Sequence, residues 1–366
     1  MTLIVLSTGC AHPGGSDRSI GSIARPFEFN QTKWETDALS HRLWESLKPA
    51  SRDQIDDSEV VKEYFRALSS QGSDKADLEN RAERILAKQI RGVLIDEGIF
   101  NPLDTFIPLK IVFPPVSFEF ESPPSLLVVS PREEIKLLKR RTLEPGLSVA
   151  QKEEIESEVD GLGYSSLVVG LGGVGFTVPT MVYETTDIRH AIDIAVEEWF
   201  HQYMFFQPLG FNYALDSLGW RTNPDIATMN ETVAGIVSKE IGEKVYSKYY
   251  APVEEEPPPP AGPSEFSLLM REIRINVDRL LAEGKATQAE EYMRERRDFL
   301  ASKGYYIRKL NQAYFAFHGT YADEPTTVSP IGKDLQKLRA DSSSLGEFLN
   351  EVKTMTNYED LKRAIQ

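Results

Sequence analysis

The sequence predicts an α+β protein that is mainly helical and contains a small mixed β-sheet. Apolar residues recur at helical spacing over residues 31–97 and again from residue 266 onward. Between these regions lie short β-branched and aromatic runs that prolines interrupt, a pattern typical of short or edge strands. The 366 residues are 41% hydrophobic and 27% charged, so the chain can build a sizeable core.

Each element follows from its local pattern, taken in chain order. Helices are expected where apolar residues return every three to four positions, at residues 31–97, 131–141, 150–159, 187–206, 228–249, 266–283, 286–302 and 304–318, with shorter pieces after Pro330. Strands are expected where β-branched residues dominate short runs, at residues 111–113, 116–120, 126–129 and 167–182. The glutamates and prolines after Val253 can form neither helix nor strand and should make an extended loop.

These elements are expected to form one domain with five consecutive parts. The parts are an N-terminal signal remnant and linker, 1–30; a helical segment, 31–107; the sheet with the helices of a candidate site, 108–250; the proline-rich loop, 251–265; and a helical region packed on the same core, 266–366.

Two classes of ligand are disfavoured. The net charge of −15 argues against a nucleic-acid surface, because neutralising phosphates takes clustered Lys and Arg. The run from Gly170 to Gly175 satisfies the G-x-G-x-x-G pattern of dinucleotide sites. Such a site needs a helix that begins at those glycines, and an extended segment with a proline follows instead. A bulged, glycine-rich strand is the better interpretation.

The N-terminus bears on localisation. Cys10 is the only cysteine, so the chain cannot form an internal disulfide. Residues 3–10 run from apolar to small to cysteine, which resembles the end of a bacterial lipoprotein signal. No stretch reaches the ~20 apolar residues of a membrane span. A lipid on Cys10 would therefore be the sole anchor, at the cell membrane on its extracytoplasmic side. The alternative is a frayed N-terminus with a free thiol in a cytoplasmic protein.

Glu197, Glu198 and His201 form the most informative cluster of the chain. On a helix with 3.6 residues per turn they fall within about 100° of arc, so they can converge on one ion. Their neighbours are apolar, and two adjacent carboxylates would be costly to bury there unless they are paired or bind a metal. A lone Glu-x-x-His could also be half of a di-iron site, but the sequence contains no second Glu-x-x-His.

A second helix can complete this cluster. Glu231 stands one turn before the small residues Ala234 and Gly235, which let two helices approach closely, and Asn230 suits an N-cap. His190 lies ~16 Å along the helix axis from His201, too far to share an ion, and is expected at the surface.

These motifs resemble the gluzincin metallopeptidases, in particular bacterial aminopeptidase-like members. The resemblance spans roughly residues 165–320. It rests on Glu197-Glu198-x-x-His201, on Asn230-Glu231-Thr-x-Ala234 and on a later helical region with Leu310-Asn-Gln-Ala. It implies a zincin-like core with Glu198 as general base, and with His201 and Glu231 as metal ligands. Glu197 takes the place of the first His of His-Glu-x-x-His.

The resemblance also implies a cofactor and a mode of substrate binding. One divalent ion is expected, zinc in the first instance. A set of two carboxylates and one imidazole shifts preference towards manganese or iron, and makes the ion a weaker Lewis acid. The glycine-rich strand at 167–182 would hold a peptide by β-augmentation. His318 and Tyr321 could donate to the oxyanion, although packing of the C-terminal helices is the better explanation for them.

Three functions are consistent with these patterns. The first is a metal-dependent peptidase that hydrolyses peptide bonds through a metal-activated water, with Glu198 as base. The second is a non-catalytic, peptidase-like lipoprotein that binds envelope peptides or a protein partner. It is motivated by the replacement of the first His by Glu197. The third is a purely structural helical protein in which the candidate ligands lie apart.

Overall fold

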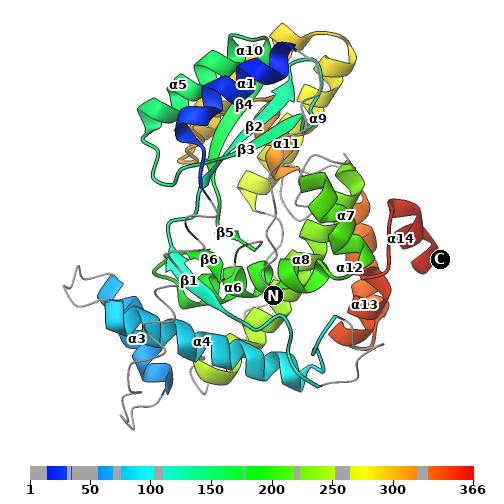
Figure 1. Cartoon of the computed structure of the whole chain (residues 1–366). Coiled ribbons are helices and arrows are strands. Elements are labelled where there is room, and N and C mark those ends of the chain that lie inside the picture. The colour runs from blue at the N-terminus through cyan, green and yellow to red at the C-terminus, as the bar shows by residue number, and fades with distance from the viewer. Residues whose placement is uncertain are drawn as a thin grey trace.

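The structure is a computed structural model that describes residues 15–30, 34, 57–68, 76–102, 110–175, 177, 179–217, 223–251, 264–319 and 329–366. Within these ranges the chain forms two lobes, one mainly helical and one built around an antiparallel sheet (Figure 1). We call them the helical lobe and the sheet lobe.

The helical lobe combines segments from three separate stretches of the chain. In chain order it consists of α3 (Asp57–Leu68), α4 (Ala76–Asp96), β1 (Phe118–Glu121), β5 (Gly173–Val174), β6 (Thr180–Tyr183), α6 (Ile188–Met204), α7 (Pro208–Ser217), α8 (Pro224–Tyr249), α12 (Ile331–Asp341), α13 (Leu345–Val352) and α14 (Tyr358–Ala364).

The sheet lobe contains the remaining described elements. They are α1 (Gly15–Ala24), the 3-10 helix Arg25–Phe27, β2 (Ser125–Pro131), β3 (Lys139–Leu143), α5 (Val149–Asp160), β4 (Tyr164–Gly170), α9 (Glu265–Ala282), α10 (Ala286–Ser302) and α11 (Gln312–His318). The C-terminal helical region expected at 266–366 is thus divided, with α9–α11 in the sheet lobe and α12–α14 in the helical lobe (Figure 1).

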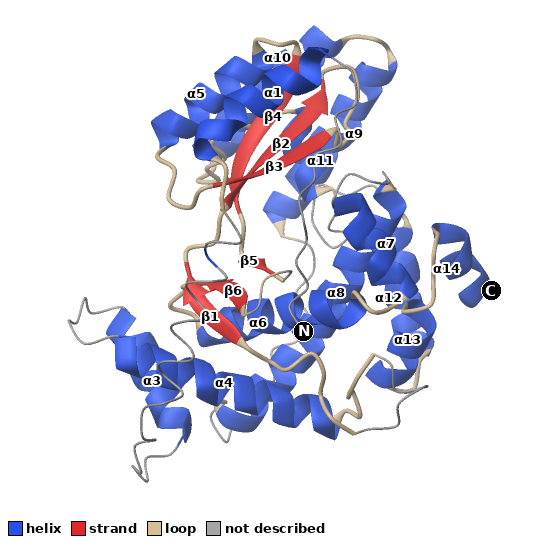
Figure 2. Cartoon of the chain, in the orientation of Figure 1, coloured by secondary structure: helices blue, strands red, loops and turns tan. Residues whose placement is uncertain are grey.

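The predicted α+β class is confirmed, but the strands form two sheets where the sequence suggested one (Figure 2). The sheet of the helical lobe is mixed and has the order β1-β6-β5, with β1 parallel and β5 antiparallel to β6. The sheet of the sheet lobe is antiparallel and has the order β3-β2-β4. Between β1 and β2 the chain passes from one sheet to the other through Pro123 and Pro124, which cannot donate to a ladder.

The central strand β2 shows why the apolar run at 126–129 is nearly continuous. Leu127 and Val129 face a core shared with α1 and α5, where Ile155 is also buried. Val128 points to the opposite face and packs with Ala313 of α11. Because helices cover both faces of this sheet, both sets of alternating side chains are apolar.

The prediction of a helix at 131–141 is wrong. The chain turns after Pro131 and returns as β3, which pairs with β2 from Ser125↔Leu143 to Val129↔Lys139. The Ser130 hydroxyl oxygen accepts the backbone N–H of Lys136 at 3.2 Å and closes the turn. Pairing with β2 satisfies the backbone hydrogen-bonding groups of this segment. The tertiary contacts therefore outweigh its local helical pattern.

Two further segments differ from the sequence-based expectation. Residues 111–113 are not a strand, and their irregular path is held by a 2.8 Å hydrogen bond from Phe113 N–H to the Phe100 carbonyl. The helix expected at 304–318 begins only at Gln312, where Asn311 is the N-cap. The residues before it are irregular, and Arg308 among them binds the buried Glu156 carboxylate.

The single strand expected at 167–182 is instead divided into β4, β5 and β6, and β4 lies in a different sheet from the other two. Strands β1 and β2 and helices α5, α6, α8, α9 and α10 match their predicted positions to within a few residues, and α3 and α4 fall inside 31–97. Residues 35–56, most of the proline-rich loop and Cys10 lie outside the described residues. In the described ranges, no helix has both the length and the apolar sequence needed to cross a membrane.

The packing of α6 on α8 positions the candidate site and buries the Asp193 carboxyl group. Gly242 of α8 makes this approach possible, since a Cβ there would overlap the Asp193 carboxylate. Burial raises the pKa of Asp193 to about 7. The nearby cations Arg189 and Lys239 only partly oppose this effect, and neighbouring acids add to it.

This raised pKa predicts that the stability of the protein falls as pH rises from about 4 to 7. Folded Asp193 keeps its proton up to pH about 7, whereas the unfolded chain releases it near its ordinary pKa of 3.8. The stability that the protonated Asp193 contributes is therefore fully present below the unfolded pKa. It is lost as the pH rises through the pKa of the folded state. An Asp193→Asn variant should be more stable than wild type by about 1–2 kcal/mol above pH 7, after allowing for solvent screening.

Thermal unfolding at pH 4 and pH 8 measures this difference. The increase in melting temperature caused by Asp193→Asn should be small at pH 4 and reach a few degrees at pH 8. Glu291→Gln, which removes an exposed carboxylate of α10, is the control and should show no such dependence. An equal gain at both pH values would mean that the charged form of Asp193 is not penalised.

Candidate metal centre

Helix α6 presents Glu197 and His201 one turn apart. Asp187 begins the helix as its N-cap, with its carboxylate accepting the N–H groups of Arg189 and His190. Most of the apolar side chains between Ala191 and Met204 are buried, including Trp199 at 1% exposure. The helix can therefore rotate little on the core, and the face that carries Glu197 and His201 is held towards Glu231 of α8. His190 is exposed, as the sequence predicts.

Helix α8 brings Glu231 to the same place. The helix begins at Pro224 with Asn223 as its N-cap. The predicted N-cap role of Asn230 is therefore wrong, since Asn230 lies two turns inside the helix. An Asn followed by an acidic residue is a common signal for the start of a helix. Asn223 followed by Pro224 is a stronger signal, and the helix begins there.

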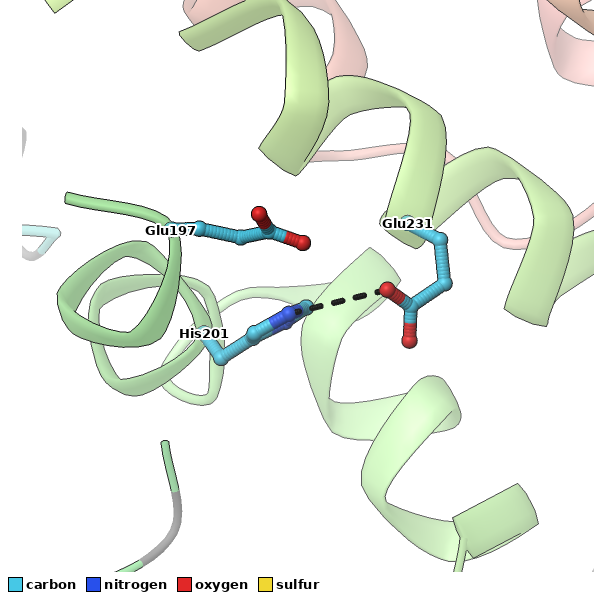
Figure 3. A group of neighbouring side chains, drawn as sticks. All are labelled: Glu197, His201 and Glu231. Atoms are coloured by element: carbon cyan, nitrogen blue, oxygen red, sulfur yellow. Dashed lines mark ion pairs between the residues drawn. The ribbon is translucent and has the colours of Figure 1, made fainter. Parts of the chain in front are cut away.

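The three candidate ligands meet in space. One ligand atom from each of Glu197, His201 and Glu231 lies within 4.8 Å of the others. His201 Nε2 lies 3.7 Å from Glu231 Oε2 (Figure 3). The third hypothesis, a structural protein whose candidate ligands lie apart, is contradicted by this arrangement.

The spacing and the charges suit a divalent cation. Two ligands at 2.0–2.2 Å from a tetrahedral ion lie roughly 3.4 Å apart, close to the 3.7 Å found here. Glu231 Oε2 is buried and has no hydrogen-bond partner among the described residues. A buried carboxylate oxygen left in this state is costly unless a cation or a proton occupies the space in front of it.

Asn230 holds the ring of His201 from the side opposite Glu231. Its amide lies 3.0 Å from His201 Nδ1, and the Asn230 side chain is fully buried. The amide oxygen has no hydrogen-bond partner among the described residues. Because amide O and N positions are assigned rather than observed, turning the amide lets Nδ1–H donate to Oδ1 and leaves the Nε2 lone pair for a metal.

Electrostatics keep His201 in the form that a metal requires. Burial lowers the pKa of His201, and Glu231 opposes this only in part. The imidazole is therefore neutral at pH 7, as a metal ligand must be. This leaves three acids around one neutral ring, a set that attracts a cation.

Tyr213 of α7 is a site residue that the sequence analysis missed. Its hydroxyl donates to Glu231 Oε1, and its ring stacks on His201 with centroids 5.5 Å apart. Burial and the Glu231 charge raise the pKa of Tyr213, so the phenol keeps its proton. An aromatic residue on an apolar helix gives no local sign of such a role, which depends on how α7 packs against α8.

Glu198 faces the glycine-rich segment beside the three ligands. The Gly175 backbone N–H donates to its carboxylate, and a Cβ at Gly173 would overlap that carboxylate. A Cβ at Gly175 would lie 2.7 Å from the Glu198 carbonyl oxygen and 2.9 Å from His201 Cβ. The glycines thus allow the backbone of β5 to approach α6. Burial, followed by the charges of Glu197 and Glu231, raises the pKa of Glu198 well above its ordinary value.

The glycine-rich segment forms β5, an edge strand, as its predicted extended character implied. No helix begins at Gly172 or Gly173, so the dinucleotide pattern has no structural counterpart.

The other predicted site residues lie elsewhere. His318 ends α11 in the sheet lobe, where its ring packs on Tyr314 at 4.2 Å and on Phe317. Burial lowers the pKa of His318 to about 4. These contacts fit the packing interpretation, and a role in stabilising an oxyanion stays a prediction. Tyr321, its predicted companion, lies outside the described residues.

Comparison of the chain with protein-family models, with curated proteins and with solved structures found no match.

Proposed function

We propose that this protein is a metal-dependent peptidase with a zincin-like core. In this proposal Glu197, His201 and Glu231 hold one divalent cation, and Glu198 is the general base. The observation that carries the proposal is the approach of two carboxylates and a neutral imidazole, from two buried helices, to within 4.8 Å of one another. The adjoining carboxyl group of Glu198 has a raised pKa, which fits the role of a base.

Each residue has a distinct part in the proposed hydrolysis. The cation, when bound, would supply Lewis acidity to the attacking water and to the peptide carbonyl. Glu198 takes a proton from the water and returns it to the leaving amine. The raised pKa of Glu198 means that this carboxylate holds a proton more readily than an ordinary one, as a group that takes up a proton must. Asn230 orients His201, and Tyr213 orients Glu231 through its hydroxyl.

The free edge of β5 supports a peptide as the substrate. Among the described strands, in the order β1-β6-β5, only one side of β5 is paired, so its other side can accept an extended chain. The contact of Gly173 and Gly175 with Glu198 brings this edge next to the proposed base. A peptide paired with the outer edge of β5 would then lie beside the strand that contacts Glu198.

Glu197 favours a second candidate, a non-catalytic peptide-binding protein. A carboxylate in place of a first His lowers the net charge of the loaded centre by one, so the ion polarises a carbonyl less. An oxygen-rich set also favours manganese or iron over zinc. In either case we propose that a lipid on Cys10 tethers the protein to the cell membrane.

Metal analysis combined with a peptide digest distinguishes the two candidates. Protein purified without added metal should contain about one zinc, manganese or iron per chain. It should cleave members of a peptide library, and lose cleavage in EDTA until the same metal is returned. Metal-free protein that binds peptides without cleaving them would favour the second candidate. Metal-free protein that neither binds nor cleaves peptides would contradict both.

A further inference from the structure

A cavity of about 370 Å³ in the sheet lobe lies between the N-terminal end of β4, helix α10 and the segment before α11. None of the proposed metal ligands lines it. Four cations and two anions do: Arg132, Arg294, Arg297, Lys309, Asp160 and Glu290. This is an unusual concentration of positive charge in a chain with a net charge of −15.

Two of the four cations are already neutralised within the wall of the cavity. Arg132 forms a bidentate pair with Glu290, with N–O distances of 2.7 and 2.6 Å. Lys309 pairs with Asp160 at 2.8 Å. Because both anions of the cavity are used in these pairs, the remaining two arginines determine its net charge.

Arg294 and Arg297 lack a comparable partner. Both lie on α10, three residues apart and therefore on one face of the helix. Within the described ranges Arg294 makes no hydrogen bond and no close ion pair, and it acts on the Glu290 carboxylate, which Arg132 already binds, only through the attraction of their charges. Arg297 pairs only with its neighbour Asp298 at 2.8 Å, and the Asp298 side chain is 66% exposed. An exposed pair of this kind contributes little and gives way readily to a better acceptor.

A neutral donor completes the cavity. Ser165 lines it from the beginning of β4. The Ser165 oxygen accepts the Ala313 N–H at 3.4 Å, which leaves its own hydrogen to donate. Two guanidinium groups and a hydroxyl are the kinds of donor that a phosphate dianion takes. The volume is at the lower end of the range for small-molecule pockets.

We propose that this cavity binds a small phosphate dianion, either inorganic phosphate or a phosphate monoester, between Arg294 and Arg297. The two arginines supply the charge, and the Ser165 hydroxyl supplies an orienting hydrogen bond. The Arg132–Glu290 and Lys309–Asp160 pairs hold the wall rigid and keep its acids from competing with the ligand.

Isothermal titration calorimetry of the full chain with inorganic phosphate and with glycerol phosphate tests this proposal. One site per chain with a Kd below about 1 mM is expected at low salt. The ratio of the two affinities shows whether the ester or the free ion is the better ligand. Succinate should bind at least tenfold more weakly, because a guanidinium pair holds the three oxygens of a phosphate better than separated carboxylates.

Variants and a chelator locate the site. Arg294→Gln combined with Arg297→Gln should weaken phosphate binding at least tenfold, and Arg294→Gln alone should weaken it measurably. The control Arg271→Gln removes an exposed arginine of neighbouring α9 and should leave the Kd unchanged. Binding should persist in EDTA, which separates this cavity from the proposed metal centre. The proposal would be overturned if phosphate did not bind at concentrations up to 10 mM or bound no more strongly than succinate. It would also be overturned if the double substitution left phosphate binding unchanged or if EDTA abolished it.

Discussion

Replacing Glu198 with Gln should lower peptide hydrolysis by about 10²–10⁴-fold while the metal content stays that of wild type. Glutamine keeps the shape of the side chain and can still accept the Gly175 N–H through its amide oxygen, but it cannot take a proton from water. The measurement is kcat/KM on the peptide that wild type cleaves best, with elemental analysis of the same preparation.

A second readout separates a catalytic role from a structural one. The raised pKa of Glu198 means that burying its charge costs stability at neutral pH. Metal-free Glu198→Gln should therefore unfold at the same temperature as metal-free wild type or higher. Glu291→Gln is the matched control on an exposed surface. Unchanged turnover in Glu198→Gln would remove Glu198 from the mechanism, whatever the metal content.

Glu231→Gln should reduce bound metal to below one tenth of the wild-type content. The substitution keeps an oxygen that can accept the Tyr213 hydroxyl, so the packing of α7 on α8 is preserved. It removes the negative charge that faces His201 Nε2 at 3.7 Å. A carboxamide is a much weaker ligand for a divalent transition metal than a carboxylate, because it is neutral.

Chelation adds a thermodynamic test of the same site. A metal held at 100 times its Kd stabilises the folded state by about 2.7 kcal/mol, so EDTA should lower the melting temperature of wild type by several degrees. Glu231→Gln should be insensitive to EDTA. Glu243→Gln, which changes a carboxylate on the same helix that pairs with Arg189, should respond as wild type does. If Glu231→Gln retained both the metal and the EDTA response, Glu231 would not be a ligand.

Several features of the site could be read from the sequence because they are local. The four-residue spacing of Glu197 and His201 places them on one helix face whatever the rest of the chain does. The apolar residues around them predict a buried α6, and Trp199 and Phe200 are indeed buried. Glu231 could be named because small residues follow it on its own helix, which is again a property of one segment.

Other features depend on partners that are distant in the sequence. Asn230 has the pattern of a helix start, and only the register of α8 against α6 turns its side chain towards His201. Tyr213 belongs to a helix without polar periodicity, and its hydroxyl finds Glu231 only once α7 has packed. The same holds for the cavity of Arg294 and Arg297, which forms where α10 meets β4.

The strands show this division most clearly. A strand is completed by hydrogen bonds to another segment, so residues 139–143 can be helical by local pattern and still become β3 once β2 is available. A helix completes its hydrogen bonds within itself, and so the spacing in the sequence was sufficient for α6 and α8. The sequence alone determined the α+β class, the main helices and the identity of the three candidate ligands. The tertiary structure decided the two separate sheets, the partners of His201 and Glu231, and the approach of β5 to Glu198, because each of these depends on contacts between segments far apart in the chain.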